Sequence, residues 1–168
     1  MRIATFNLLH GRSLEDGQVH LDRLAAAGGA LDADVLGRQE VDRGPERAHR
    51  ADLTAVAAQA MAAVDHRFVP AFAEPAGGDY GIALLTRYPV VSWQVLRLPR
   101  APVRVPLWIP DLGRVVAVRD EPRVAVAAVL DAPSGRCTVC TTHLSFVPGV
   151  NRGSCAAWCA RWPTCPGR

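Results

Sequence analysis

The stretch from Ala33 to Glu40 reads ADVLGRQE and decides how the chain folds. Val35 and Leu36 are apolar and the stretch ends in a carboxylate, a pattern that is typical of a buried strand. In open α/β sheets, ligands bind outside the carboxyl ends of the strands. We therefore expect Glu40 at the C-terminal edge of a sheet. An isolated glutamate there can be a metal ligand, a general base or a solvated strand-end residue, and this stretch alone leaves the three interpretations open.

The segments around this stretch indicate an α/β fold. Alternation predicts a strand over Arg2–Leu8, and the spacing of the leucines predicts a helix over Leu21–Leu31. With Ala33–Glu40 they make a strand–helix–strand unit, so its two strands should be neighbours in one sheet. Further along we expect a helix capped by Asp52 that runs to about Val64. We also expect strands over Arg67–Phe72, Tyr80–Thr86, Val90–Leu98, Val115–Val118, Arg123–Leu130 and Arg136–Thr142.

Composition and charge limit the classes of protein to which the chain can belong. The chain has 168 residues, of which 49% are hydrophobic and 21% charged, as expected of one globular domain. The net charge of +3 is too small to argue for nucleic acid by itself. We see no apolar run long enough for a membrane span and no secretory leader, so a cytoplasmic location is expected. Pro99–Leu112 holds four prolines, and we expect an irregular connection there.

The five cysteines do not predict a disulfide framework, because their number is odd and no leader precedes them. Cys137 and Cys140 have the spacing of a zinc or redox motif. Their segment is expected to be a strand, however, and alternation then sends the two side chains to opposite faces. We interpret them as structural thiols.

Three polar residues fall at the ends of expected strands, namely Asn7, Glu40 and His143. Each has a simpler explanation when taken alone: Asn7 can start the turn after the first strand, and His143 can be a structural histidine. Taken together, they predict a polar cluster at one edge of an α/β sandwich.

Four segments resemble, in this order, motifs of the endonuclease/exonuclease/phosphatase superfamily: ATFNLLHG, DVLGRQEVD, YGIALLTRYP and TTHLSF. The superfamily includes deoxyribonuclease I-like nucleases, apurinic-site endonucleases, sphingomyelinases and inositol polyphosphate phosphatases. The resemblance covers Met1 to about Val150. It implies a four-layer α/β sandwich and metal-dependent hydrolysis of a phosphoester, with a phosphodiester as the first expectation.

The resemblance also implies roles for the three polar residues. Glu40 would be a ligand of Mg²⁺ or Mn²⁺, Asn7 would help to hold the metal and the phosphate, and His143 would contact the scissile phosphate. Mg²⁺ prefers oxygen ligands and keeps several waters, so one carboxylate and an amide can suffice. The metal would neutralise charge on the phosphoryl oxygens, and a histidine donor would add to that stabilisation.

The chain also departs from the family pattern. Arg38 stands where the strand usually has an apolar residue, and Tyr80 where an asparagine often stands. The family's later D-x-N motif and final Asp–His pair have no counterpart, because no Asp, Glu or His follows His143. We therefore expect a fold whose C-terminal part is missing and a hydrolase that is poor or inactive. The alternatives are a non-catalytic phosphate-binding module and a non-functional fragment.

The substrate and the assembly are less constrained by the sequence. A nucleic acid, a phospholipid head group and an inositol phosphate all remain candidate substrates, and we expect a monomer. The domain is expected to span residues 1–150. Residues 151–168 form an atypical tail that holds three of the five Cys and two of the four Trp and lacks the apolar period of a helix. We interpret this tail as out of frame after Arg152, the alternative being a genuine variable C-terminus.

Overall fold

The computed structural model describes residues 1–102, 104–147 and 149–161. The chain forms two compact units. The first unit consists of Met1–Leu96 and Val124–His143, and the second of Arg97–Arg123 and the chain from Leu144 onward. No helix of the described residues is long and apolar enough to cross a membrane.

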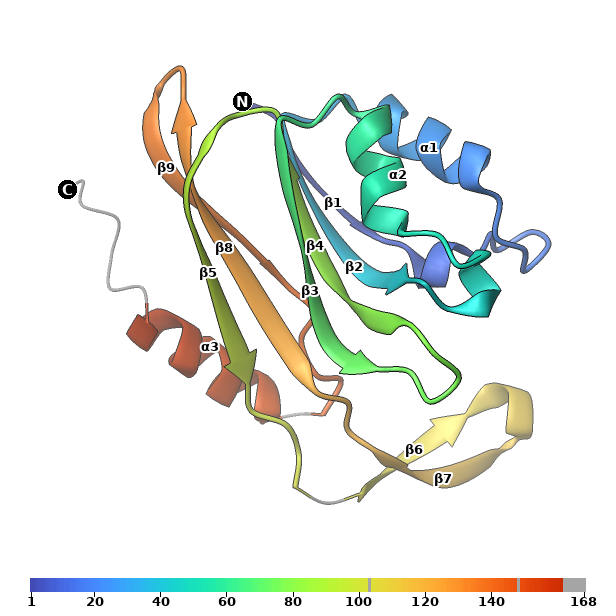
Figure 1. Cartoon of the computed structure of the whole chain (residues 1–168). Coiled ribbons are helices and arrows are strands. Elements are labelled where there is room, and N and C mark those ends of the chain that lie inside the picture. The colour runs from blue at the N-terminus through green and yellow to red at the C-terminus, as the bar shows by residue number, and fades with distance from the viewer. Residues whose placement is uncertain (103, 148, 162–168) are drawn as a thin grey trace. The chain divides into compact units, whose positions relative to one another are not determined.

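The first unit is built on a four-stranded sheet with the strand order β1-β2-β4-β3 (Figure 1). Its strands are β1 (Ile3–Asn7), β2 (Val35–Arg43), β3 (Asp65–Ala73) and β4 (Asp79–Thr86). β1 and β2 pair in parallel, as expected of a strand–helix–strand unit, whereas β4 pairs antiparallel with both β2 and β3. The neighbouring position predicted for the first two strands is therefore confirmed.

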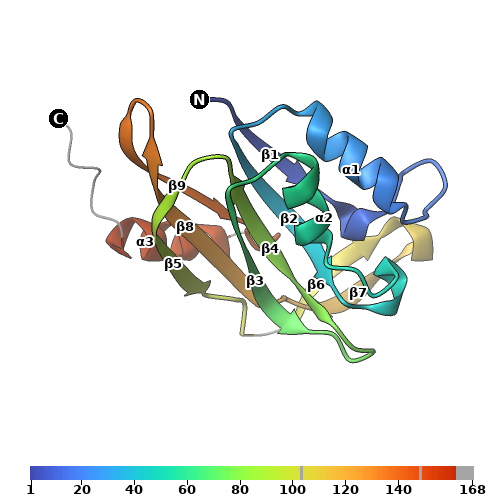
Figure 2. The same cartoon turned by 45° about the horizontal axis from the view of Figure 1, so that its top comes forward.

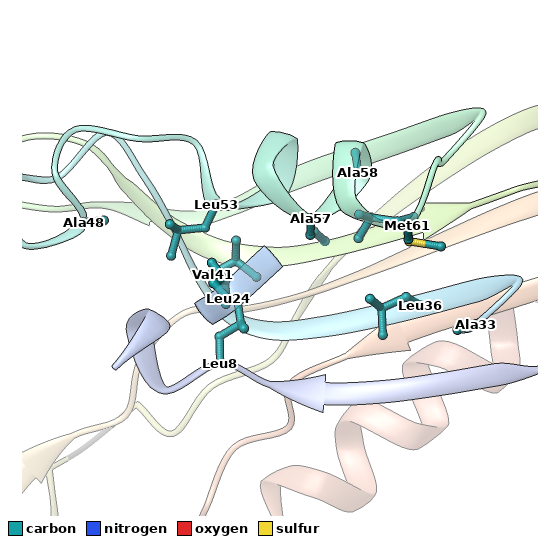
Figure 3. Close-up of a cluster of buried hydrophobic side chains, with 12 residues drawn as sticks. Leu8, Leu24, Ala33, Leu36, Val41, Ala48, Leu53, Ala57, Ala58 and Met61 are labelled. Atoms are coloured by element: carbon teal, nitrogen blue, oxygen red, sulfur yellow. The ribbon is translucent and has the colours of Figure 1, made fainter. Parts of the chain in front are cut away.

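Two helices, α1 (Leu21–Ala30) and α2 (Leu53–Ala60), lie side by side on one face of this sheet (Figures 1 and 2). Figure 3 shows the apolar cluster between these helices and the sheet. The Asp52 carboxylate caps α2 as predicted, because Oδ1 accepts hydrogen bonds from Thr54 N at 2.8 Å and Ala55 N at 3.1 Å. The helix ends earlier than predicted, since Ala62 has a φ of 53° and the Val64 amide already bonds to Thr86 O.

A second sheet packs on the opposite face of the first. It contains β5 (Val90–Leu98), β8 (Arg123–Ala132) and β9 (Gly135–Thr142) in the order β5-β8-β9. Side chains of β2 and β4, such as Val35 and Leu84, share a buried cluster with Val126 of β8. Helices, sheet and sheet thus give three layers of the expected α/β sandwich within this unit. The strands expected over Arg123–Leu130 and Arg136–Thr142 are confirmed as β8 and β9, and they pair as an antiparallel hairpin.

The second unit differs from the prediction in two places. β6 (Arg104–Ile109) lies inside the segment expected to be irregular, and it forms an antiparallel hairpin with β7 (Arg114–Arg119), which confirms the strand expected over Val115–Val118. A two-stranded hairpin has two open edges, and prolines are tolerated in such edge strands. The helix α3 (Val150–Arg161) forms where no helix was expected. Its alanines favour a helix, and its small residues Gly153 and Ser154 allow close packing, with Gly153 against Pro99.

Arg38 is the least favourable residue of the first core. Its side chain is fully buried in β2, and among the described residues its Nε and Nη2 atoms have no hydrogen-bond partner. Nη1 lies 3.5 Å from Leu53 O, and the guanidinium lies 5.9 Å from the centroid of the Phe6 ring. Burial lowers the pKa of Arg38 to about 10, so the group is still charged at neutral pH and is held without adequate compensation.

Replacing Arg38 with methionine should stabilise the protein. The exchange removes a buried charge and keeps an unbranched side chain of similar length. We expect the free energy of unfolding, measured by urea denaturation, to rise by about 1–4 kcal/mol. Arg87→Met is the matched control and should destabilise instead, because Arg87 donates to Met61 O and to Asp32. A loss of stability in the Arg38 variant would show that this cation is compensated in solution.

Candidate active site

Asn7 is the last residue of β1, and its side chain connects this strand to β2. Asn7 Oδ1 accepts a hydrogen bond from Leu9 N at 2.9 Å, and Asn7 Nδ2 donates to Glu40 Oε1 at 2.7 Å. The first contact fixes the orientation of the amide, so that its NH₂ group faces the carboxylate. Asn7 thus makes the contact of a turn residue and also contacts Glu40, the second residue of the predicted polar cluster.

Glu40 lies in a β-bulge, not at the end of its strand. β2 continues to Arg43, and its register with β4 shifts between Arg38 and Val41. Glu40 itself has a φ of 54°, in the left-handed region that non-glycine residues rarely adopt. The expected position at the C-terminal edge of the strand is therefore wrong, because a bulge inserts an extra residue and the strand continues beyond it.

The bulge decides which way Glu40 points. Leu36 and Val41 both belong to the apolar cluster on the helix side, although five positions separate them. Gln39 points to the opposite side, where it bonds to Thr5 and Thr141. In a regular strand the residue after Gln39 would point toward the helices. The inserted residue instead leaves the Glu40 carboxylate on the side of Asn7.

His143 follows β9 and reaches the same carboxylate. His143 Nε2 lies 3.9 Å from Glu40 Oε1, which makes an ion pair when the imidazole is protonated. The side chains of His143 and Glu40 are 29% and 18% exposed, so both remain accessible to a ligand. The structure thus brings Asn7, Glu40 and His143 together around one carboxylate.

A close approach of β9 to β2 holds His143 in place. A Cβ atom on Gly37 would lie 2.7 Å from Thr141 Oγ1 and 2.9 Å from Thr141 Cβ, so only glycine fits here. Two residues further along β2, Gln39 Nε2 donates to Thr141 Oγ1 and to Thr5 Oγ1, both at 3.0 Å. Gln39 and Thr141 were not predicted as positioning residues, although alternation from Asn7 places Thr5 on their side of the sheet.

An open cavity of about 480 Å³ lies beside the three residues. Asn7 and His143 line it together with Thr5, Gln39 and Thr141 and with small or apolar residues of β1, β2, β4 and β9. Cys140 lines the cavity, whereas Cys137 packs against the core of the two sheets, so the two cysteines are on opposite faces as predicted. The cavity offers hydroxyl, amide and imidazole groups to a polar ligand.

The donors present suit a hard divalent cation only in part. A carboxylate and an amide oxygen are ligands that Mg²⁺ and Mn²⁺ accept, with water completing the shell. Among the described residues, however, no group of three or more His, Cys, Asp or Glu side chains is placed to hold a metal. Glu40 would therefore be the main protein ligand of such an ion.

A second polar network also joins the segment that follows β1 to the strand β2. His10 Nδ1 lies 3.2 Å from Asp42 Oδ1, and Arg47 donates to both Asp42 oxygens at 2.6 and 2.7 Å and to Glu74 at 2.8 Å. The ring of Tyr80 packs on that of His10, with the centroids 5.1 Å apart. Burial alone would raise the pKa of the Asp42 carboxyl, but the hydrogen bonds from His10 and Arg47 outweigh it and lower that pKa.

Gly37→Ala should test the close approach of β9. The added methyl group overlaps Thr141, and we expect a loss of about 1–3 kcal/mol in the free energy of unfolding. Adding Thr141→Gly should recover part of this loss, which a double-mutant cycle of urea denaturation would measure. Gly28→Ala is the control, because nothing lies within 4 Å of the added Cβ and the residue is helical. Equal losses at the two glycines would contradict the contact.

Asp42→Asn should destabilise the protein in a pH-dependent way. The variant removes one of the two charged partners of Arg47 and leaves it paired with Glu74 alone, so at pH 7 we expect a loss no greater than the lower end of about 3–5 kcal/mol. The folded-state pKa of Asp42 is lowered, so its contribution is present above the unfolded pKa of about 3.9 and is lost as the pH falls through the folded value. The gap to wild type should therefore close only below about pH 4. Asp16→Asn, in an exposed pair with Arg23, is the control and should leave the free energy of unfolding nearly unchanged.

Comparisons with known proteins show the family and the fold of the chain. The model of the Endonuclease/Exonuclease/phosphatase family matches residues 4–159. No curated protein matches the chain significantly. An endonuclease/exonuclease/phosphatase from Beutenbergia cavernae has a similar structure, with a TM-score of 0.71 and 23% identity over 96% of this chain and 44% of its own.

Two further structures share the fold at lower identity. They are a mannosyl-6-phosphatase from Bacteroides thetaiotaomicron (TM-score 0.60, 16% identity, 96% of this chain and 58% of its own) and sphingomyelinase C from Streptomyces griseocarneus (TM-score 0.54, 20% identity, 94% and 53%). The chain thus spans about half the length of the solved structures that it matches. The fold and the family match confirm the resemblance seen in the sequence, and the chain belongs to the endonuclease/exonuclease/phosphatase family.

Proposed function

We propose that this chain binds a divalent cation and a phosphoester at Asn7, Glu40 and His143, and that the reaction of the site is metal-dependent hydrolysis of a phosphoester. The observation that carries the proposal is the meeting of the Asn7 amide and the His143 imidazole at one oxygen of Glu40. A carboxylate without a positively charged partner nearby would repel a phosphate group, so the site suits a phosphate only once a cation is bound.

Each of the three side chains would have its own role. Glu40 would hold Mg²⁺ or Mn²⁺, and the bound metal would neutralise charge on the phosphoryl oxygens. The Asn7 oxygen, expected as a further ligand, accepts a hydrogen bond from Leu9 N instead, so Asn7 would act on the metal through Glu40. His143 would donate a hydrogen bond from Nε2 to one of those oxygens, because its ring already faces the carboxylate. Asn7 would keep the Glu40 side chain in this orientation through its hydrogen bond.

A phosphodiester is the substrate class that we propose first. The similar structures include a phosphatase and a sphingomyelinase, whose names imply a sugar phosphate and a phospholipid head group. Nucleic acid and inositol phosphates are further candidates within the same chemistry. The monomeric state and the cytoplasmic location expected from the sequence stay predictions.

A non-catalytic phosphate-binding module is the second candidate. It is favoured because a bound cation would occupy Glu40, and because Asp42, the next carboxylate along β2, is buried against Arg47, so that neither is placed as a base for water. Water attack benefits from a positioned base, which typically contributes roughly 10²- to 10⁴-fold. The non-functional fragment and the frameshift after Arg152 also stay hypotheses, although the family match extends to residue 159.

Glu40→Gln tests the metal site that the hydrolase and the binding module share. Titration calorimetry with Mn²⁺ should show a weakening of at least about 10- to 100-fold, the range seen when even the outer partners of a metal site are lost. Glu15→Gln removes the same charge from an exposed loop residue and should bind like wild type. Equal Mn²⁺ affinity of wild type and the Glu40 variant would contradict the site.

Turnover is then measured separately, with Mg²⁺ and an aryl phosphodiester. Metal-dependent hydrolysis that is lost in His143→Ala would support the hydrolase. Metal and phosphate binding without turnover would support the binding module. Because the carboxylate of Glu40 is needed in both cases, the binding experiment tests the site itself and the turnover experiment tests only its chemistry.

A further inference from the structure

The hairpin of β6 and β7 presents an apolar surface that the proposed hydrolysis does not use. Trp108 is 58% exposed and Val115 is 59% exposed, and the two residues face each other directly in the ladder. Leu112, in the turn between the strands, is 56% exposed. Large apolar side chains that gather on a surface mark an interaction site more often than single exposed ones do.

The same face of the hairpin carries positive charge at its other end. Alternation places Arg104, Pro106 and Trp108 on one face of β6, opposite Arg119, Ala117 and Val115 of β7. Arg104 and Arg119 are therefore directly paired, and like charges in that position destabilise a hairpin unless an anion lies near them. Arg104 Nη1 also donates to Ala117 O at 3.0 Å, which keeps this guanidinium against the ribbon.

The order of these groups along the hairpin matches the surface of a lipid leaflet. Trp108 lies four positions after Arg104 in β6, which corresponds to roughly 13 Å along a strand. Interfacial segments bury their apolar side chains roughly 5–10 Å deep at the boundary between headgroups and acyl chains. With Trp108, Val115 and Leu112 at that depth, the arginine pair would lie at the level of the headgroup phosphates.

We infer that the β6–β7 hairpin docks this chain on a lipid surface that carries anionic headgroups. Charge complementarity supports this partner, since the segment from Arg97 to Arg119 has five arginines and one acidic residue, Asp111. The aliphatic side chains argue against single-stranded nucleic acid, because bases stack on aromatic rings and Trp108 is the one ring on this face. Docking requires neither metal nor turnover, so it is independent of the proposed hydrolysis.

Vesicle binding tests the inference. The full chain is sedimented with vesicles of phosphatidylcholine alone or mixed with phosphatidylglycerol. We expect binding to the mixed vesicles only, and loss of this binding in 1 M salt, where the screening length falls to about 3 Å. Trp108→Ser should weaken binding by about tenfold or more, and Arg119→Ser by roughly fivefold.

A matched pair of valines serves as the control. Val115→Ser should weaken vesicle binding, whereas Val91→Ser, an exposed valine of β5 at 49%, should not. The tryptophan emission should shift to shorter wavelength when vesicles are added to wild type, and this shift should be lost in Trp108→Phe while binding remains. This second readout does not depend on comparing the stability of variants.

Several results would overturn the inference. They are equal binding to both kinds of vesicle, equal weakening by the two valine variants, and an unchanged emission spectrum on binding. Binding to single-stranded nucleic acid but not to vesicles would assign the hairpin to that partner instead. A dimer that protects Trp108 from an aqueous quencher would assign it to a second copy of the chain.

Discussion

The hydrogen bond from Asn7 Nδ2 to Glu40 Oε1 is the contact on which the site depends. It joins two parallel neighbouring strands, and it exists only because β2 is irregular at that point. A non-glycine residue in the left-handed region costs of the order of 1–3 kcal/mol. The tight pairing of β2 with β1 on one side and β4 on the other holds this conformation in place. Strain of this kind is characteristic of functional positions.

Much of the first unit could be predicted from its residues. Alternation and strand–helix–strand connectivity placed β1 and β2 next to each other, and Asp52 marked the start of α2. The three candidate site residues were predicted because each falls at the end of an expected strand, and the structure brings them together. The bulge at Glu40 was not found, although the odd separation of Leu36 and Val41 on the helix side is its signature. Because the strand was expected to end at the carboxylate, Val41 was not assigned to it, and the separation could not indicate a bulge.

Two elements of the second unit, β6 and α3, were not predicted, and the physical reason differs between them. The prolines of the β6 segment argue against a central strand but not against a hairpin with two open edges. The α3 segment has no apolar stripe, and its helix depends on alanines and on small residues that allow close packing. Periodicity detects helices that bury a continuous stripe, and it misses helices that are defined by propensity and by a single close contact.

Adjacent residues of β2 show that the polar side chains on the two faces of one strand find hydrogen-bond partners to different degrees. Gly37 and Gln39 face β9, where a missing side chain and two hydrogen bonds let the sheets approach closely. Arg38, between them, faces the helices and finds inadequate partners for its guanidinium. The chain therefore loses stability on one face of the strand while the other face is well satisfied. Since the satisfied face is the one that positions His143, a defect on the helix side can persist without disturbing the site.

Whether the site can supply a general base depends on the partners that its carboxylates already have. Asp42, the next carboxylate along β2, is fully buried and accepts hydrogen bonds from Arg47 to both of its oxygens. Its lowered pKa keeps it ionised, but a base needs a lone pair that can reach water, and this one is enclosed. Glu74 pairs with the same arginine. Among the described residues, Glu40 is the carboxylate of this group that is not paired with an arginine, and a metal bound there would take the lone pairs that a base requires. The proposed site would therefore be better equipped to bind and polarise a phosphoester than to activate the water that would cleave it.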